Sequence, residues 1–168
     1  LSQAVRPEME ALARETGERV NLAVPLGREA LYLDQVEGTK LVRLFTAPGS
    51  RAPLHATGVG KVFLAYLGVP EGLSLTPYTP HTLTRLPDLL RELEAVRGRG
   101  YALDNEEKEL GVRCVAAPVF GASGGVVAAL SLSAPASRLS LEEAHRLAPR
   151  VVEAARRASL RLGYTGEV

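Results

Sequence analysis

The chain has 168 residues, of which 46% are hydrophobic and 23% are charged, a composition typical of one soluble globular domain with its own core. Its formal net charge is +1, so the overall charge gives no reason to expect direct binding to nucleic acid or to an anionic membrane. A single cysteine excludes an intramolecular disulfide. No apolar run approaches the length of about 18 residues that a membrane helix needs. We therefore expect a cytoplasmic protein without a secretory leader or a membrane span.

The first predicted element is an amphipathic helix over residues 2–16, where apolar side chains recur at helical spacing and a glycine follows. Apolar residues alternate over residues 19–24 and dominate residues 30–36. A glycine-containing turn separates these two segments, which predicts a β-hairpin. Residues 40–46 are a candidate for a third strand, closed by a Pro-Gly pair.

A second helix is predicted within residues 53–67, with Thr57 as its N-cap. Gly58 and Gly60 fall in the first turn of this helix, where glycine lowers helix propensity. We expect glycines at these positions only if the backbone must approach another group closely.

Residues 68–83 contain three prolines and two glycines, so we expect a loop with at most one short helical turn. The helix that follows is expected to use Thr84 as its cap and to carry Pro87 in its first turn. Gly98 or Gly100 is expected to end it.

Three further strands are predicted at residues 101–104, 112–120 and 125–133. The last two are joined by the segment GASGG, whose glycines permit the positive φ values of a hairpin turn. Ser140 is the predicted cap of the final helix, and Pro149 is expected to kink that helix or to split it in two.

The predicted order is helix, three strands, two helices, three strands and helix. Strands grouped in hairpins, with helices available to cover them, indicate an α+β domain: a mostly antiparallel sheet of about six strands with flanking helices. The sequence contains no internal repeat or linker, so residues 1–168 are expected to form one domain.

Residues 100–138 carry polar side chains where core residues are expected. Asp104 lies in an acidic turn, Cys114 lies on the next strand, and Ser131 and Ser133 share one face of the last strand because side chains alternate. A few polar groups among apolar ones are typical of a small-ligand pocket. The alternatives are a solvated turn, a cysteine buried as a small hydrophobe, and hydroxyls bonded to the protein itself.

Glu106 and Glu107 lie in the same acidic turn and are interpreted as structural residues that cap backbone amides. Nucleophilic catalysis by Cys114 would need a nearby histidine and an orienting partner, and the spacing of the three histidines suggests neither. No pair of ligands has zinc-like spacing, so a metal site is not expected. The Gly-x-Gly pair before the second helix lacks the rest of a dinucleotide-binding fingerprint.

Two blocks of the sequence carry a family resemblance. The first is PLHATGVGKVFLAYL at residues 53–67, and the second covers residues 84–140. The second block contains an acidic turn after Gly-Tyr, a G-x-x-C-x-A-A-P-V strand, and an S-x-S strand that leads to P-x-S-R. In order and spacing, these blocks closely resemble the C-terminal effector-binding domain of the IclR family of bacterial transcriptional regulators. The resemblance extends from residue 2 to about residue 163.

This resemblance implies a GAF-like or PAS-like domain that binds a small-molecule effector and mediates dimer or tetramer contacts. In the family, an N-terminal winged helix-turn-helix domain binds the operator. That domain is absent from this chain, so we expect the chain to be part of a longer regulator and not to bind operator DNA alone. We expect no cofactor and no metal.

The effector-binding positions of the family, carried over residue by residue, are Gly58, Val59, Asp104, Cys114, Ser131 and Ser133. In better-known members these positions hold small organic acids such as glyoxylate or pyruvate. Amides at a helix N-terminus attract a carboxylate, and serine hydroxyls can donate to its oxygens. Val59 stands where many members have alanine, which narrows that wall of the pocket.

The leading hypothesis is a non-enzymatic, ligand-sensing regulatory domain whose effector changes subunit packing and thereby DNA binding by the N-terminal domain. Two alternatives stay open. One is a small hydrolase or isomerase that uses Asp104 and Cys114, and the other is a pure oligomerisation module with a collapsed pocket.

Overall fold

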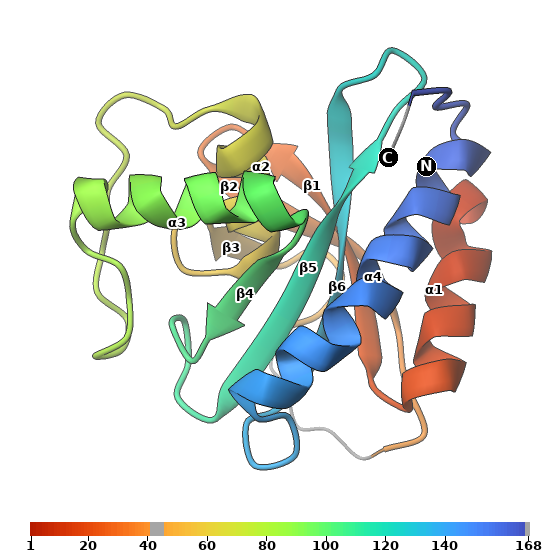
Figure 1. The fold of residues 1–168 in the computed structure, drawn as a ribbon, viewed down its shortest axis with the longest axis horizontal. Coiled ribbons are helices and arrows are strands. Elements are labelled where there is room, and N and C mark those ends of the chain that lie inside the picture. The colour runs from red at the N-terminus through yellow and green to blue at the C-terminus, as the bar shows by residue number, and fades with distance from the viewer. Residues whose placement is uncertain (41–45, 167–168) are drawn as a thin grey trace.

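The computed structural model describes residues 1–40 and 46–166. Within these residues the chain forms a six-stranded sheet in the order β3-β2-β1-β6-β5-β4, and every neighbouring pair of strands is antiparallel (Figure 1). The elements in chain order are α1 (Ser2–Thr16), β1 (Arg19–Leu26), β2 (Glu29–Val36), β3 (Arg51–Pro53), α2 (Gly58–Leu67), α3 (Leu86–Arg99), β4 (Ala102–Asn105), β5 (Val112–Phe120), β6 (Val126–Pro135) and α4 (Leu141–Arg161).

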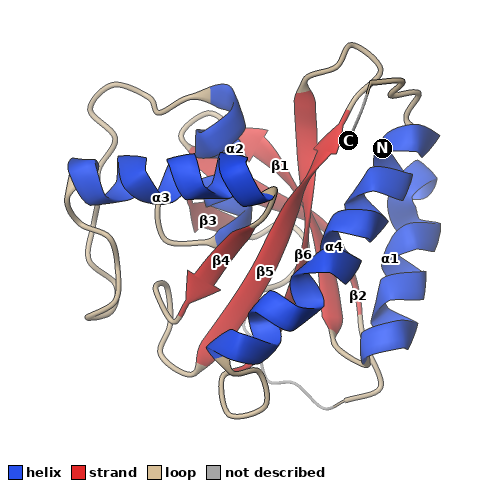
Figure 2. Cartoon of the chain, viewed as in Figure 1, coloured by secondary structure: helices blue, strands red, loops and turns tan. Residues whose placement is uncertain are grey.

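Helices cover both faces of the sheet (Figure 2). Because side chains alternate along a strand, Val20 and Leu22 of β1 enter one core with α1 and α4, whereas Ala23 enters a second core with α2 and α3. In β6, Leu130 belongs to the first core and Ala129 to the second. The architecture is therefore an α+β fold with one central sheet, as the sequence predicted.

The helix α4 packs along β5 with its alanine-rich side toward the sheet. The side chain of Ser140 caps it, since its Oγ accepts a hydrogen bond from the Glu143 amide at 3.1 Å. Pro149 lies on the exposed side of the helix, where water can hydrate the carbonyl that loses its partner. The helix is therefore continuous through Pro149, and the expectation that it would be split was wrong.

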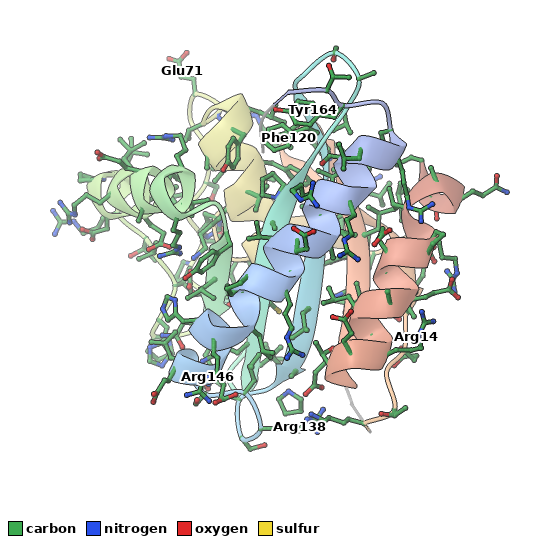
Figure 3. The ribbon with its side chains drawn as sticks, turned by 45° about the vertical axis from the view of Figure 1, so that its right-hand side comes forward. Arg14, Glu71, Phe120, Arg138, Arg146 and Tyr164 are labelled. Atoms are coloured by element: carbon green, nitrogen blue, oxygen red, sulfur yellow. The ribbon has the colours of Figure 1, made fainter. Side chains whose placement is uncertain are left out.

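Contacts near both ends of α4 fix it to the strands (Figure 3). Beyond its C-terminal end, the Phe120 and Tyr164 rings stack with centroids 4.9 Å apart. The Phe120 amide also donates to Ser159 Oγ at 2.9 Å. Before its N-terminal end, Arg138 forms an ion pair with the buried Glu18 at 2.8 Å, which joins the end of β6 to the start of β1.

One detail between α2 and β4 differs from the prediction. The residue at the N-cap of α3 is Arg85 and not Thr84, because the helix begins only at Leu86, with Pro87 in its first turn. Residues 68–83 contain turns and no helical turn. Gly100, with a φ of 86°, ends α3 in the left-handed conformation that glycine favours.

The predicted strand at residues 40–46 falls mostly on residues 41–45, which lie outside the described residues. The third strand of the sheet is the short segment β3, which pairs with β2. No helix within residues 1–40 and 46–166 is long and apolar enough to span a membrane.

The glycines at the start of α2 are explained by close packing against the chain itself. A Cβ on Gly60 would lie 2.4 Å from the Leu54 carbonyl oxygen, and a Cβ on Gly58 would lie 3.1 Å from the Ala116 Cβ. Thr57 caps the helix by accepting a hydrogen bond from the Gly60 amide at 3.1 Å. The predicted close approach is therefore confirmed, and it holds the α2 N-terminus against β5.

Candidate functional site

A row of polar side chains crosses the sheet on the face that α2 covers. In the strand register, Asn21 of β1 lies opposite Ser131 of β6, and Ser133 lies opposite Cys114 of β5. Cys114 in turn lies opposite Asp104 of β4. Directly opposed residues of antiparallel strands point to the same face, so four neighbouring strands contribute to one polar row.

The middle of this row is linked by hydrogen bonds. Asn21 Nδ2 donates to Ser131 Oγ and to Ser133 Oγ, each at 3.1 Å. The Ser133 hydroxyl also lies 3.1 Å from the Cys114 sulfur. On the other side, Gln35 Nε2 donates to Asn21 Oδ1 at 3.0 Å. These groups satisfy one another, which allows hydroxyls and an amide to be buried in the sheet.

A cavity of about 190 Å³ lies over one end of the row. Its floor is formed by strands β4, β5 and β6, and its walls by β2, β3, the cap of α2 and the acidic turn after β4. The lining residues are Tyr32, Thr46, Ser50, Arg51, Ala52, Thr57, Asp104, Lys108, Glu109, Val112, Cys114 and Ser133.

Three of the six sequence-predicted site residues, Asp104, Cys114 and Ser133, line this cavity. Ser131 lies one hydrogen bond behind it, bonded to Asn21. Gly58 abuts Ala116, and Val59 belongs to the apolar core of α2 and α3, so the side of α2 that reaches the cavity is its cap, Thr57. Effector binding by these residues stays a prediction.

Asp104 is a buried carboxyl with a side-chain exposure of 4%. Its Oδ1 accepts a hydrogen bond from the Glu107 amide at 2.8 Å. Burial raises the pKa of Asp104 to about 7, and the negative charge of Glu107 adds to that rise, while backbone hydrogen bonds and Lys61 oppose it. Near neutral pH this carboxyl can therefore either donate or accept a hydrogen bond.

Cys114 is partly accessible from the cavity. Desolvation, followed by the nearby charge of Asp104, raises the pKa of its thiol well above the ordinary value. The group is therefore a neutral thiol near pH 7, whereas nucleophilic cysteines depend on a lowered pKa. Two of the three histidine rings have partners elsewhere: His55 contacts the Thr76 carbonyl, and His145 contacts the Tyr101 hydroxyl.

The acidic turn is held from below by a buried ion pair. Lys61 of α2 has an exposure of 1%, and its Nζ lies 2.9 and 3.0 Å from the two carboxylate oxygens of Glu107. Glu107 Oε2 also accepts a hydrogen bond from the Asn105 amide at 2.9 Å. Glu106 Oε1 accepts one from the Gly111 amide at 2.9 Å. The interpretation of both glutamates as structural residues that cap amides is confirmed.

Sequence reasoning missed Asn21, Tyr32 and Lys61. A signal for Asn21 existed, because the alternation of Val20 and Leu22 already places Asn21 on the opposite face. Tyr32 had no such signal, since its orientation depends on a β-bulge between β1 and β2. In the sequence, Lys61 has the character of a residue on a helix surface, and it is buried because the acidic turn covers it.

A second depression, of about 240 Å³, lies between α1 and α4. Three of its charged side chains are already ion-paired: Glu8 with Arg161, and Glu153 with Arg157. Within residues 1–40 and 46–166, no three His, Cys, Asp or Glu side chains gather as a metal site. The cavity over the polar row is thus the best candidate for a ligand site.

An antiparallel sheet with helices on both faces is the α+β arrangement of GAF-like domains, and the small polar cavity on one face has the character of a small-molecule site. The particular family follows from comparison with known proteins. Residues 1–160 match the family described as "Bacterial transcriptional regulator IclR C-terminal", and the chain belongs to it.

Among the relatives, the HTH-type transcriptional regulator BhcR of Paracoccus denitrificans is 39% identical over 165 residues, which cover 95% of this chain and 59% of BhcR. The chain thus spans less than two thirds of that relative. The IclR crystal structure from Thermotoga maritima is similar with a TM-score of 0.89 and 36% identity, covering 97% of this chain and 68% of that one.

A further similar structure is the inducer-binding domain of PobR from Acinetobacter, a double mutant in complex with 3-hydroxybenzoic acid. It has a TM-score of 0.85 and 26% identity, and the match covers 95% of this chain and 97% of that one. These relatives are transcriptional regulators, and their similarity covers the whole sheet and its helices.

Proposed function

We propose that this chain is the effector-binding domain of a longer bacterial regulator and that its effector is a small organic acid. One observation carries the proposal: Asp104, Cys114 and Ser133 converge from three strands on one cavity beside the apolar core of α2 and α3. Convergent polar groups in a mostly apolar cavity are typical of small-molecule sites.

Two of the charged side chains around the cavity are cationic and could pair with an anionic ligand, beside the acidic Glu109. Arg51 and Lys108 lie at its rim, and the Lys108 ammonium lies 4.7 Å from the centroid of the Tyr78 ring. The N-terminus of α2 adds its positive dipole end through Thr57, and the neighbouring amides of Gly58 and Val59 are the proposed carboxylate contacts. Protonated Asp104 could donate to the same ligand, and ionised Asp104 could accept from its hydroxyl.

The regulatory step proposed is a change in subunit packing. An effector that binds one arrangement of a dimer or tetramer better than another shifts the equilibrium between them by its difference in affinity. DNA binding would then be performed by an N-terminal winged helix-turn-helix domain of the full-length, cytoplasmic regulator. This role requires no catalysis and no metal or cofactor.

The competing enzymatic hypothesis, a hydrolase or isomerase that uses Asp104 and Cys114, is less well supported. A neutral thiol beside a carboxyl of raised pKa is a weak nucleophile, and the residues that line the cavity include no histidine within the described chain. The third hypothesis, a pure oligomerisation module, is disfavoured by the open cavity.

A thermal-shift assay with glyoxylate, pyruvate and 3-hydroxybenzoate tests the proposal. A ligand that binds only the folded state stabilises that state by about 2.7 kcal/mol when its concentration is about 100 times its Kd. We expect at least one acid to raise Tm and the Asp104→Ala, Ser133→Ala double variant to lose that rise. The matched control is Ser74→Ala, in a loop away from the cavity. An undiminished rise in the Tm of the double variant would show that the acid binds elsewhere. No rise in Tm with any of the acids would favour the oligomerisation module.

Light scattering coupled to size exclusion tests the assembly part separately. We expect a dimer or tetramer whose proportion changes with the acid that binds. A strict monomer at high protein concentration, with and without that acid, would contradict regulation through subunit packing.

A further inference from the structure

Tyr32 is a largely buried side chain that lines the cavity. The tyrosine has an exposure of 7%, its ring packs in the core of α2 and α3, and it lines the cavity. Within the described residues, no hydrogen bond is formed by its hydroxyl. By contrast, the hydroxyl of Tyr101 lies 2.7 Å from His145 Nδ1. Because the Tyr32 hydroxyl is unbonded, is not among the fully buried polar atoms of the described residues and belongs to a side chain that lines the cavity, it is available to a ligand.

A β-bulge places Tyr32 on this face. In the pairing of β1 with β2, Ala23 lies opposite Tyr32 but Leu22 lies opposite Asp34, so Leu33 is an extra residue in β2. The shift turns both Tyr32 and Gln35 toward the polar row, although their separation of three residues would place them on opposite faces of a regular strand.

Small side chains around the ring keep its end free. Ala23, Ala30 and Ala52 are buried members of the same core, and Ala52 also lines the cavity. Alanines at these positions leave room beyond the phenol ring, where larger residues would fill the cavity. The ring is thus fixed by packing while its hydroxyl reaches the space that a ligand would occupy.

Across the cavity, Tyr32 is close to Cys114 and Asp104. Burial, and then the proximity of these two groups, raises the pKa of the Tyr32 phenol well above its ordinary value. The phenol therefore stays protonated under physiological conditions, and a protonated phenol can donate a hydrogen bond.

We propose that the Tyr32 hydroxyl donates a hydrogen bond to an acceptor oxygen of the bound acid, opposite the polar groups of Asp104 and Ser133. This inference rests on the proposed function, and it adds a ligand contact that the family resemblance does not include. It also defines the ligand class more closely: a compact acid with oxygen atoms at two ends, one for Tyr32 and one for the floor of the cavity.

Calorimetric titration of the chain with glyoxylate, pyruvate and 3-hydroxybenzoate tests the inference. Tyr32→Phe keeps the ring and removes only the hydroxyl. We expect the Kd of the acid that binds to rise about tenfold, in keeping with the loss of one hydrogen bond in a buried site. Because that hydroxyl has no partner in the described chain, Tm without ligand is expected not to fall. The matched control is Tyr101→Phe, which removes a bonded hydroxyl outside the cavity and should leave the Kd unchanged.

The outcomes separate this inference from the proposed function. An unchanged Kd in Tyr32→Phe, while the wild-type chain binds an acid, overturns the role of Tyr32 and leaves the function standing. A fall in the Tm of ligand-free Tyr32→Phe shows that the hydroxyl serves the fold, which also overturns the inference. If the wild-type chain binds none of the three acids, the organic-acid function and the inference fail together.

Discussion

The two faces of the sheet are built differently from the same strands. On the face covered by α1 and α4, β6 contributes Ala128, Leu130 and Leu132, which are all fully buried and apolar. On the opposite face the same strand contributes Ser131 and Ser133, which belong to the polar row. Neighbouring residues of one strand thus face either a dry core or the polar face that carries the cavity.

The comparison teaches how a small domain divides stability and function. The α1/α4 face excludes water with large aliphatic side chains and contributes hydrophobic stabilisation. Both cores contain alanines, but on the α2/α3 face Ala52 also lines the cavity, where a small side chain leaves space. The polar row that replaces apolar residues there is tolerated because its groups bond one another.

The largest expected effect comes from the buried ion pair beneath the acidic turn. Glu107→Ala leaves the Lys61 ammonium buried at 1% exposure, and within the described residues its remaining ion pair is with Glu92 at 4.0 Å. We expect the free energy of unfolding to fall by about 3–5 kcal/mol, the cost of breaking a buried ion pair. Urea denaturation measures it, with the exposed Glu94→Ala on α3 as the control. A loss no greater than that of the control would show that the pair is not buried.

The next effect compares neighbouring residues on the two faces. Leu130→Ala, on the dry face, is expected to cost about 2–5 kcal/mol of unfolding free energy because it opens a cavity in a packed core. Ser131→Ala, one residue away on the polar face, removes one hydrogen bond and should cost only about 0.5–1.5 kcal/mol. Denaturation of both variants under the same conditions provides the comparison. Equal losses would contradict the division of the sheet into a dry face and a polar face.

A smaller effect concerns pH. The pKa of Asp104 is raised from 3.8 to about 7, so the folded state binds the proton more tightly than the unfolded state does. Its contribution to stability is present below pH 3.8 and is lost as pH rises toward 7. Relative to the wild type, Asp104→Asn should therefore gain stability over this range. A difference between the two proteins that does not change with pH in thermal unfolding would refute the raised pKa.

The sequence predicted most of the fold because its elements carry strong local signals. Hydrophobic alternation in residues 19–24, the cap at Thr57 and the cap at Ser140 are all found as predicted. The Thr84 cap was wrong because the first turn of α3 is set by Pro87 and the residues after it, not by the nearest capping side chain. Pro149 was expected to kink α4 or to split it in two, and the split did not occur, because packing of the buried side of the helix holds it together.

The candidate site was only partly predictable. Asp104, Cys114 and Ser133 were found from polar residues in apolar strands and from the family resemblance, and they do line one cavity. Tyr32 could not be found, because a single extra residue in β2 reverses which side chains face the cavity. Lys61 could not be found either, since its burial depends on a turn more than forty residues away in the chain.

The central claim is that the polar half of the α2/α3 face is the effector site. The most direct measurement is a titration of the chain with pyruvate or glyoxylate followed by amide NMR spectra. The claim predicts that the largest chemical-shift changes fall on the amides of Tyr32, Asp104, Cys114 and Ser133. The claim would be contradicted if the largest chemical-shift changes fell on α1 and α4. It would also be contradicted if the acid bound saturably without changing the amide shifts of these four residues.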